Sequence, residues 1–545
     1  MGQRFQHWIT QSDIQPQTLN EVKKLIYSNR QFEEIQHLEY GDYGLVEVEL
    51  AILNAIKLNK RIALYADYDV DGTMSCVSWI WFFRAIGFNN YTHYIPCRFK
   101  EGYGVNLQAI RHLIDSESAE LIITMDTGIT ANEEAALCKE RGVQFICTDH
   151  HKIQKEKMPD CLVLNPKQHP DPDFQELCGC GITFVLLRRL AKHFNVAHSL
   201  WNDLLALAGM ATICDVVPLN KVNHKLAKLG VAALYRSERP VLQKLLKSVN
   251  AQQELDERDV GFRLGPRINA VGRLEHADKI IGAFLNEEPD QLIHFMNVCN
   301  DRRKVIQQDI YIDARKQAEQ LASSPILFIG GDWHPGVVGI VASRLAEEFW
   351  RPVWLFNRSE SICKGSARSI SGFDVTEAMS QCAELFIKFG GHSAAGGFSF
   401  SVEQEAELRS RLTSYCERIK SSQPALWESK ITLDCQLPPT LLNLDLTYQL
   451  DLLKPFGMGF AEPRFQLSLK IAKIDFLKDK NSGRPKHTII HVECHNRRER
   501  IIFFNQVIEE LQGHAQACFI VTLGRNQFRG ETQLQLLGVD YSLMH

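Results

Sequence analysis

Short apolar runs alternate with helical patterns along residues 45–235. The runs Arg61–Ala66, Leu121–Met125 and Gln144–Thr148 are typical of buried strands. Helical periodicity follows the first run over Met74–Ile86 and the second over Asn132–Arg141. This alternation predicts a parallel sheet with helices on both faces, so the fold class is α/β.

A second α/β region is expected further along the chain. Residues Asp290–Ala322 contain no Pro or Gly and have a helical period, which predicts a long connecting helix. The run Pro325–Gly331 then restarts the α/β pattern, which ends in the glycine-rich segment Gly390–Gly397. Ser421–Pro424 has the composition of a domain boundary.

Beyond this boundary the pattern changes to short strands and turns. Phe465–Ile474 and His487–Cys494 are two such strand-like runs, and they favour a small β-barrel. A chain of 545 residues is too long for one core. We therefore predict an N-terminal segment (1–45), a first α/β domain (46–280), a connecting helix (281–323), a second α/β domain (324–422) and a C-terminal β-barrel (423–545).

The composition excludes several classes of protein. No apolar run approaches the ~20 residues that span a bilayer, and the N-terminus lacks the apolar core of a secretory signal, so we expect a cytoplasmic protein without membrane contact. A net charge of −4 argues against a protein that coats polyanions, but it allows a local basic groove. The 15 cysteines include no CxxC pair, so buried, reduced thiols are favoured over a metal role for Cys178 and Cys180.

Acidic residues and histidines follow each predicted strand. The three strands end in Asp67-Tyr68-Asp69-Val70-Asp71-Gly72, in Asp126-Thr127-Gly128 and in Asp149-His150-His151. Asp215 follows the apolar, helix-like run Leu204–Ile213. Because ligands bind in the crevice outside the carboxyl ends of parallel strands, these side chains are expected at one edge of the sheet.

Such a cluster predicts a metal site. Asp126 alone could simply cap a helix, and either histidine alone could be structural. Five or six crowded carboxylates, however, repel one another unless cations neutralise them. Oxygen ligands with one or two imidazoles suit Mn²⁺ or Mg²⁺. Alternate residues of an extended segment point the same way, so Asp67, Asp69 and Asp71 are expected to face the crevice together, with Gly72 permitting a tight entry into the next helix.

These motifs resemble those of the DHH phosphoesterase superfamily. Five further segments extend the likeness: Cys97-Arg98-Phe99-Lys100-Glu101-Gly102-Tyr103-Gly104, Gly265-Pro266-Arg267-Ile268-Asn269-Ala270, His334-Pro335-Gly336-Val337-Val338-Gly339-Ile340, Gly365-Ser366-Ala367-Arg368-Ser369 and Gly390-Gly391-His392-Ser393-Ala394-Ala395-Gly396-Gly397. With the motifs above, these segments resemble the RecJ family of single-strand-specific exonucleases over about residues 40–400.

The resemblance implies a role for each matching residue. Asp69, Asp71, Asp126, His150 and Asp215 match the metal ligands, and Asp67 and His151 match either ligands or residues that support them. The implied catalytic set is Asp71, Asp126, His150, His151 and His392. The implied phosphate and DNA contacts are Arg98, Arg267, Asn269, Ser366, Arg368 and His392. The alternative to phosphate binding is a purely structural role, in which Arg267 and Arg368 form ion pairs and the glycines only make turns.

The resemblance also implies the activity. A family member would use two divalent ions, Mn²⁺ or Mg²⁺, to hydrolyse single-stranded DNA from its 5′ end, releasing 5′-mononucleotides in DNA repair and recombination. A helicase and a single-stranded-DNA-binding protein are the implied protein partners, and we expect a monomer. One alternative is a DHH-type phosphodiesterase of cyclic dinucleotides or very short oligonucleotides, and another is a scaffold protein that lost the chemistry.

The C-terminal barrel is expected to be an OB-fold. Phe456-Gly457-Met458-Gly459 resembles the family's entry into that domain, although Phe460 replaces the usual polar residue. An OB barrel would bind the strand through a basic groove and stacking aromatic residues. The candidates are Lys478, Lys480, Arg497, Arg498, Arg500 and Phe528, each of which could equally belong to a solvated charged surface.

Overall fold

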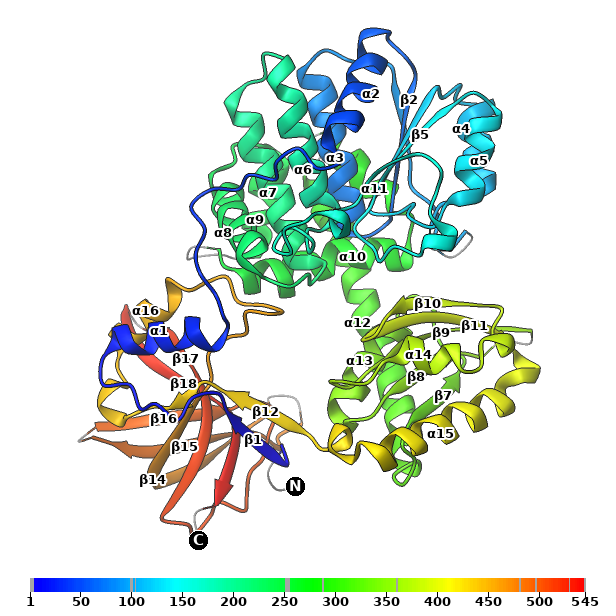
Figure 1. Ribbon diagram of the computed structural model, residues 1–545. Helices are drawn as coiled ribbons and strands as arrows, with labels where there is room; N and C mark the ends of the chain where they lie inside the picture. Colours follow the sequence, from blue (N-terminus) through cyan, green and yellow to red (C-terminus); the bar gives the residue numbers. More distant parts are fainter. Residues whose placement is uncertain are drawn as a thin grey trace. The chain divides into compact units, whose positions relative to one another are not determined.

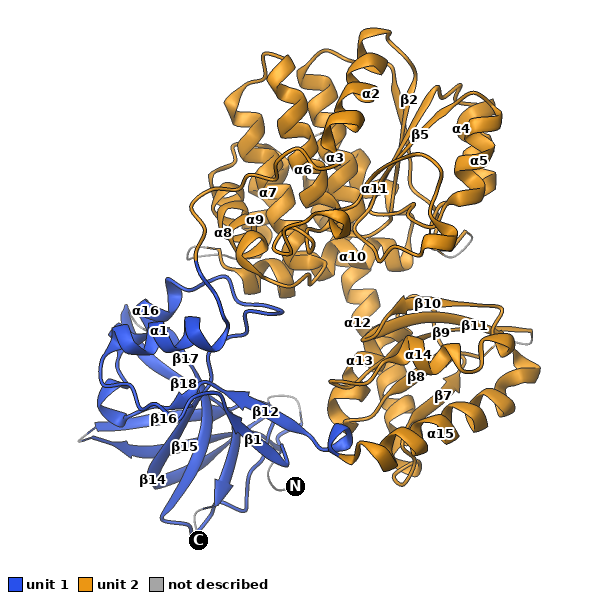
Figure 2. Ribbon diagram, in the orientation of Figure 1, with its two compact units in different colours: residues 1–33, 425–545 blue, residues 34–424 orange. Residues whose placement is uncertain are grey.

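The computed structural model divides the chain into two compact units (Figure 2). One unit is Glu34–Pro424, and the other combines Met1–Glu33 with Ala425–His545. The structure describes residues 4–98, 101–102, 104–249, 255–286, 289–358, 361–479, 482–495, 497–528 and 530–543. Phe99, Lys100, Tyr103 and Lys480, together with the side chain of Phe528, lie outside this description.

The first domain of the Glu34–Pro424 unit contains the predicted parallel sheet (Figure 1). Its strands run in the order β3–β2–β4–β5–β6, and every neighbouring pair is parallel. The strands are β2 (Ile62–Ala66), β3 (Tyr91–Tyr94), β4 (Leu121–Met125), β5 (Gln144–Thr148) and β6 (Leu162–Leu164). The three predicted strands are thus confirmed as β2, β4 and β5.

Helices cover both faces of this sheet, as predicted. Because side chains alternate along a strand, Ile62 and Leu64 of β2 join one apolar core, whereas Ala63 and Tyr65 join the other. The helices of this domain are α2 (Leu45–Lys57), α3 (Val70–Ala85), α4 (Leu107–Asp115), α5 (Asn132–Glu140), α6 (Gly179–Leu190), α7 (His198–Cys214), α8 (Lys221–Arg236), α9 (Pro240–Ser248), α10 (Gly265–Leu274) and α11 (Asp278–Leu285).

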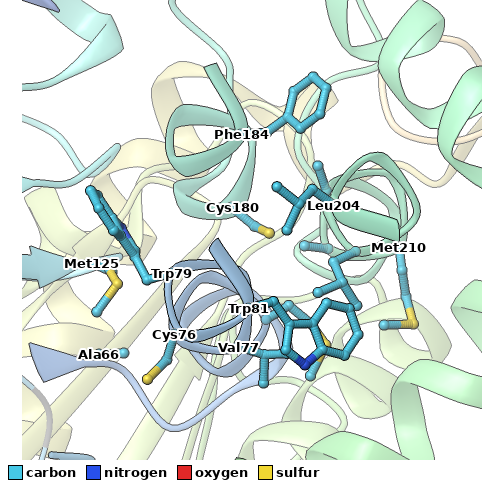
Figure 3. Close-up of a cluster of buried hydrophobic side chains, with 14 of the residues drawn as sticks. Ala66, Cys76, Val77, Trp79, Trp81, Met125, Cys180, Phe184, Leu204 and Met210 are labelled. Carbon is cyan, nitrogen blue, oxygen red and sulfur yellow. The ribbon is translucent and has the colours of Figure 1, made fainter. Parts of the chain in front are cut away.

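Helix α3 is the centre of the larger core. Its residues are buried from Val70 to Phe83, which places apolar side chains on every side of the helix. Figure 3 shows Trp79 and Trp81 of α3 in one cluster with Leu204 of α7. The core therefore holds α3, whose first turn carries a predicted metal ligand, in a fixed position.

The predicted connecting helix is α12 (Pro289–Gln320), and it leads to the second α/β domain. That domain has a sheet in the order β10–β11–β9–β8–β7. Its elements are β7 (Leu327–Gly331), α13 (Val338–Phe349), β8 (Val353–Asn357), β9 (Ile362–Arg368), α14 (Val375–Ser380), β10 (Lys388–His392), β11 (Ala395–Ser401) and α15 (Glu405–Ser422). The glycine-rich segment is not a simple turn, because it forms the paired strands β10 and β11.

The other unit contains the predicted barrel. The strands run in the order β13–β14–β15–β16–β18–β17, and β17 also pairs with β14, which closes the barrel. The elements are α1 (Leu19–Asn29), β1 (His7–Thr10), β12 (Lys430–Leu433), β13 (Cys435–Gln436), α16 (Leu444–Asp451), β14 (Phe465–Lys478), β15 (Pro485–Cys494), β16 (Arg497–Phe503), β17 (Gln516–Phe528) and β18 (Glu531–Leu543).

The N-terminal residues complete this barrel unit. Strand β1 pairs in parallel with β12, and Arg30 binds the buried carboxylate of Asp434. Phe460 is fully buried, with its ring centroid 4.6 Å from that of Phe32. The replacement of a polar residue by Phe460 is thus explained by packing against the N-terminal segment.

Two further predictions can be compared with the structure. The cysteines of the described residues are all free thiols, and Cys178 and Cys180 are buried, as expected. Within the described ranges, no helix combines the length and the apolar character that crossing a bilayer requires.

Candidate metal and phosphate site

The acidic residues and histidines predicted from the strand ends converge at one edge of the parallel sheet. Their candidate ligand atoms form three groups in which every atom lies within 4.8 Å of the others. The groups are Asp126 with His150 and His151, Asp71 with His150 and Asp215, and Asp67 with Asp69 and Asp126. All the predicted metal ligands therefore belong to one cluster, which the shared residues Asp126 and His150 link.

The first aspartate motif differs in local structure from the prediction. Asp69 is the N-cap of α3, and its Oδ1 accepts hydrogen bonds from the backbone N–H groups of Asp71 and Gly72. Asp71 therefore lies in the first helical turn rather than on an extended segment. The expected alternation of three aspartates on a strand is wrong, because the helix begins at Val70. The three carboxylates converge nevertheless.

Helix α6 orients Asp71. The carboxylate oxygens of Asp71 accept hydrogen bonds from the N–H groups of Gly179 (2.5 Å) and Cys180 (2.7 Å). These are free N–H groups of the first helical turn, where the helix dipole favours an anion. The Cys178–Cys180 segment thus supports the site through its backbone, a role that its sequence did not reveal because no local pattern links it to Asp71.

Two glycines allow the elements to approach this closely. A Cβ atom on Gly72 would lie 2.3 Å from the carbonyl oxygen of Asp67. A Cβ atom on Gly179 would lie 2.7 Å from the Cβ of Asp126 and 3.0 Å from Oδ2 of Asp71. Both positions need glycine because backbone or ligand atoms of the cluster occupy the space.

The donor atoms of the cluster fit divalent cations. Asp67 Oδ1, Asp126 Oδ1 and His150 Nε2 are buried and have no hydrogen-bond partner among the described residues. His150 Nε2 lies 3.1 Å from Asp126 Oδ1 and 3.5 Å from Asp215 Oδ2. Buried polar atoms without partners are rare in native proteins, so atoms that converge in this way are suited to metal ligation.

The pKa values of the cluster indicate the same need for cations. Burial first, and then the neighbouring carboxylates, raise the pKa values of Asp126 and Asp215 well above their ordinary range. The same causes raise the pKa of Asp71 to about 6. Burial lowers the pKa of His150 to about 3, so its imidazole is neutral and able to act as a ligand.

His151 is held by Asp149. The Nδ1 atom of His151 lies 2.7 Å from Asp149 Oδ1, which also accepts the backbone N–H of His151. Burial alone would lower the pKa of His151, but the charge and hydrogen bond of Asp149 raise it to about 9. The ring of His392, at the end of β10, stacks on His151 with centroids 5.8 Å apart. The second domain thus brings the predicted His392 to the metal cluster.

A cluster of arginines adjoins the metal cluster. The guanidinium of Arg98 lies 4.9 Å from the ring centroid of Tyr68, which stands between Asp67 and Asp69 in sequence. Arg368 donates hydrogen bonds to Ser343 and Ser366, and Arg273 donates to the carbonyl of Gly336.

These arginines are suited to an anion. Burial, together with the charges of neighbouring arginines, lowers the pKa of Arg273 to about 9 and that of Arg368 to about 10. In the described part of the chain, no carboxylate lies within 4.0 Å of the guanidinium groups of Arg98, Arg273 or Arg368. A bound phosphate would relieve their repulsion. Arg273 was missed at the sequence level, although it lies on the same helix as Arg267.

Two predicted phosphate contacts make other contacts. Arg267 donates to the carbonyl of Ser248 at 3.0 Å, at the end of α9. Asn269 accepts the backbone N–H of Val70 at 3.1 Å and thereby positions the start of α3 between Asp69 and Asp71. The structure thus brings Arg98, Ser366 and Arg368 to the arginine cluster, whereas Arg267 and Asn269 contact neighbouring elements.

Comparisons with known proteins agree with this architecture. Residues 61–212 match the DHH family N-terminal domain, residues 318–418 the DHHA1 domain, and residues 433–540 the RecJ OB domain. The single-stranded-DNA-specific exonuclease RecJ of Escherichia coli is 30% identical over 487 residues, which cover 83% of this chain and 84% of that protein. The RecJ of Bacillus subtilis is 36% identical over 77% of this chain, but the match spans only 53% of its length.

A solved structure extends the likeness to the whole fold. RecJ of Thermus thermophilus, crystallised with Mn²⁺, matches with a TM-score of 0.83 at 26% sequence identity, over 99% of this chain and 80% of that one. The arrangement of three matched domains and the identity to the curated relatives lead to one conclusion: this chain belongs to the RecJ family.

Proposed function

We propose that this chain is a single-stranded-DNA-specific exonuclease that removes 5′-mononucleotides from the 5′ end by phosphodiester hydrolysis. The observation that carries the proposal is the position of a carboxylate–imidazole cluster beside a buried arginine cluster. The first is suited to divalent cations and the second to a phosphate. The names of the relatives support DNA as the substrate.

The carboxylate–imidazole cluster would bind the metal ions. Asp67, Asp69, Asp71, Asp126, His150 and Asp215 would hold two Mn²⁺ or Mg²⁺ ions, with His151 as a further candidate ligand. Bound there, such ions activate water and stabilise the attacking and leaving oxygens of a phosphoryl centre. Asp71 is fixed by α6, so its oxygens need little reorganisation when ions bind.

The arginine cluster would bind the terminal 5′ phosphate. Arg98, Arg273 and Arg368 offer planar forks of N–H donors, and Ser366 orients Arg368. His392, stacked on His151, would contact the scissile phosphate from the second domain. Binding of the terminal phosphate beside the metal cluster accounts for attack at the first internucleotide bond, and hence for the 5′-to-3′ direction.

The test uses single-stranded DNA labelled at one end, with the full-length protein and Mn²⁺. We expect a 5′ label to be released at once as a mononucleotide, whereas a 3′ label should persist in progressively shorter strands. A duplex of the same sequence and a circular single strand should resist. Asp71→Ala should abolish the activity, and Asp160→Ala, at an exposed carboxylate paired with Lys139, should not alter it. Early release of the 3′ label, or cleavage of the circle, would contradict the proposal.

The cellular context follows from this activity. We propose a cytoplasmic monomer that acts in DNA repair and recombination, on strands that a helicase unwinds and a single-stranded-DNA-binding protein covers. Size-exclusion chromatography with light scattering tests the monomer. The rate on long strands, measured with and without a helicase, tests the first partner.

A further inference from the structure

One aromatic side chain of the helical segment that leads into α10 is exposed to solvent. Phe262 is 80% exposed, although it lies between the buried residues Val260 and Leu264. It belongs to a π-helix, η4 (Asp259–Leu264), which continues without a break into α10 (Gly265–Leu274). Such π-helical turns are rare and frequently mark functional sites.

The helix formed by η4 and α10 contacts, near both of its ends, segments that carry candidate metal ligands. At its C-terminal end, the position of Gly272 lies against the carbonyl of Tyr68, between Asp67 and Asp69. In its middle, Asn269 binds the N–H of Val70. Near its N-terminal end, the thiol of Cys214, which precedes Asp215, donates to the carbonyl of Val260 at 3.9 Å. The helix therefore passes the metal cluster from Asp67 at one end to Asp215 at the other.

Phe262 lies on the same face of this helix as Arg273. Residues eleven positions apart are within about 20° of each other around an α-helix, and the wider π-helical turn changes this only modestly. The two side chains are separated by about 16 Å along the axis, at about 1.5 Å per residue. This distance corresponds to a few nucleotides of a strand, because a stacked strand rises about 3.4 Å per nucleotide.

A second exposed apolar residue lies at the same end of the site. Val216 directly follows Asp215 and is 61% exposed. Its φ of 59° is in the left-handed region, which β-branched residues rarely adopt. Strained backbone of this kind clusters at functional sites. Two exposed apolar side chains thus belong to the segments that meet at Asp215: Val216 follows Asp215 in the sequence, and Phe262 is two residues from Val260, which contacts Cys214.

We propose that Phe262 is a stacking surface for a base on the 3′ side of the scissile phosphate. If the terminal 5′ phosphate binds Arg98, Arg273 and Arg368, the strand crosses the metal cluster and continues toward Asp215 and Phe262. A ring that stacks on bases without hydrogen bonding to them binds every sequence, as an exonuclease requires. This inference rests on the proposed function, since it takes the polarity of the strand from the 5′ phosphate site.

The experiment measures steady-state kinetics on a 5′-phosphorylated 20-mer of deoxythymidine with Mn²⁺. Phe262→Ala should raise KM by roughly 5- to 150-fold, the range that loss of one base–aromatic stack produces. Phe262→Ala should raise KM and leave kcat unchanged, whereas Phe262→Trp, which keeps an aromatic ring, should have the KM of the wild-type protein. Tyr235→Ala, at a residue of α8 that is 57% exposed, is the matched control and should not change KM.

A set of abasic substrates locates the stacked base. One base at a time is removed from nucleotides 2–5, with nucleotide 12 as a distant control. The wild-type protein should bind one of the substrates modified at nucleotides 2–5 more weakly, and Phe262→Ala should not distinguish that substrate from the intact strand. An unchanged KM in Phe262→Ala, or the same sensitivity to the abasic site in both proteins, would overturn the inference. A wild-type protein without any exonuclease activity would instead overturn the proposed function.

Discussion

Replacement of Asp126 by Asn tests whether carboxylate repulsion limits the stability of the metal-free protein. Asp126 is buried, and it has a φ of 58°, a conformation that Asn also tolerates. Its Oδ1 has no hydrogen-bond partner among the described residues. The substitution therefore removes a charge and keeps the size and backbone preference of the side chain. We expect it to stabilise the metal-free protein at pH 8.

The magnitude follows from the distances in the cluster. The ligand atoms of Asp67, Asp69 and Asp126 lie within 4.8 Å of one another. At this separation and an effective dielectric constant of about 20, two ionised carboxylates repel by about 3 kcal/mol. With an unfolding entropy of about 2.1 cal/mol/K per residue, this energy would raise the melting temperature of the Glu34–Pro424 unit by about 4 °C.

The dependence on pH gives the sign of the effect. Because folding raises the pKa of Asp126, the protonated carboxyl favours the folded state. This contribution is fully present below the unfolded pKa of about 3.9 and is lost as the pH rises through the folded pKa. The advantage of Asp126→Asn over wild type should therefore be small at pH 5 and should grow toward pH 8.

Thermal unfolding monitored by circular dichroism, with EDTA present and at several pH values, measures this effect. With Mn²⁺ added, the order should reverse, because wild type gains binding energy that the variant has lost. Asp160→Asn, at an exposed carboxylate, is the control and should leave the melting temperature unchanged. If the gain in Asp126→Asn were independent of pH, or absent at pH 8, repulsion within the cluster would be the wrong explanation.

Three further outcomes are expected from single substitutions. Arg273→Met should remove the stabilisation that inorganic phosphate gives in a thermal-shift assay, and an unchanged shift would exclude Arg273 from the anion site. Asp149→Asn should lower the pKa of His151 from about 9 toward its ordinary value in a metal-free NMR titration, since the charge that raises it is gone. Gly179→Ala should weaken Mn²⁺ binding about 10- to 100-fold by calorimetry, because its Cβ would displace Asp126 or Asp71; unchanged affinity would contradict the geometry.

The sequence predicted the convergence of the ligands because that convergence follows from general rules. Strands β2, β4 and β5 are short apolar runs, and the carboxyl ends of parallel strands share one edge. Asp67, Asp126 and His150 could thus be brought together from their positions alone. What the pattern could not give was the first turn of α3, because an N-cap such as Asp69 also suits the start of an extended segment.

Interactions between distant segments account for what the sequence did not predict. The N–H groups that bind Asp71 belong to Gly179 and Cys180, more than a hundred residues away in the sequence. Every residue except proline has a backbone N–H group, so the pattern of side chains does not indicate which of these groups bind Asp71. Phe262 lies in a π-helical turn, and the hydrophobic periodicity of the sequence does not predict such a turn. The pairing of β1 with β12 joins residues 7–10 to residues 430–433, which are far apart in the sequence.

The carboxylate cluster and the arginine cluster share one feature, which is that their charged groups are bound by uncharged partners. Buried carboxylates and buried arginines normally pair, yet here Asp71 is bound by the N–H groups of α6, and Arg368 is bound by Ser343 and Ser366. Arg273 is likewise bound by the carbonyl of Gly336. Because these hydrogen-bond partners are uncharged, the carboxylates and the guanidinium groups lie in one site without forming ion pairs with each other. The carboxylates therefore remain available for divalent cations, and the arginines remain available for a phosphate. A phosphodiester strand bound together with divalent cations supplies both ligands.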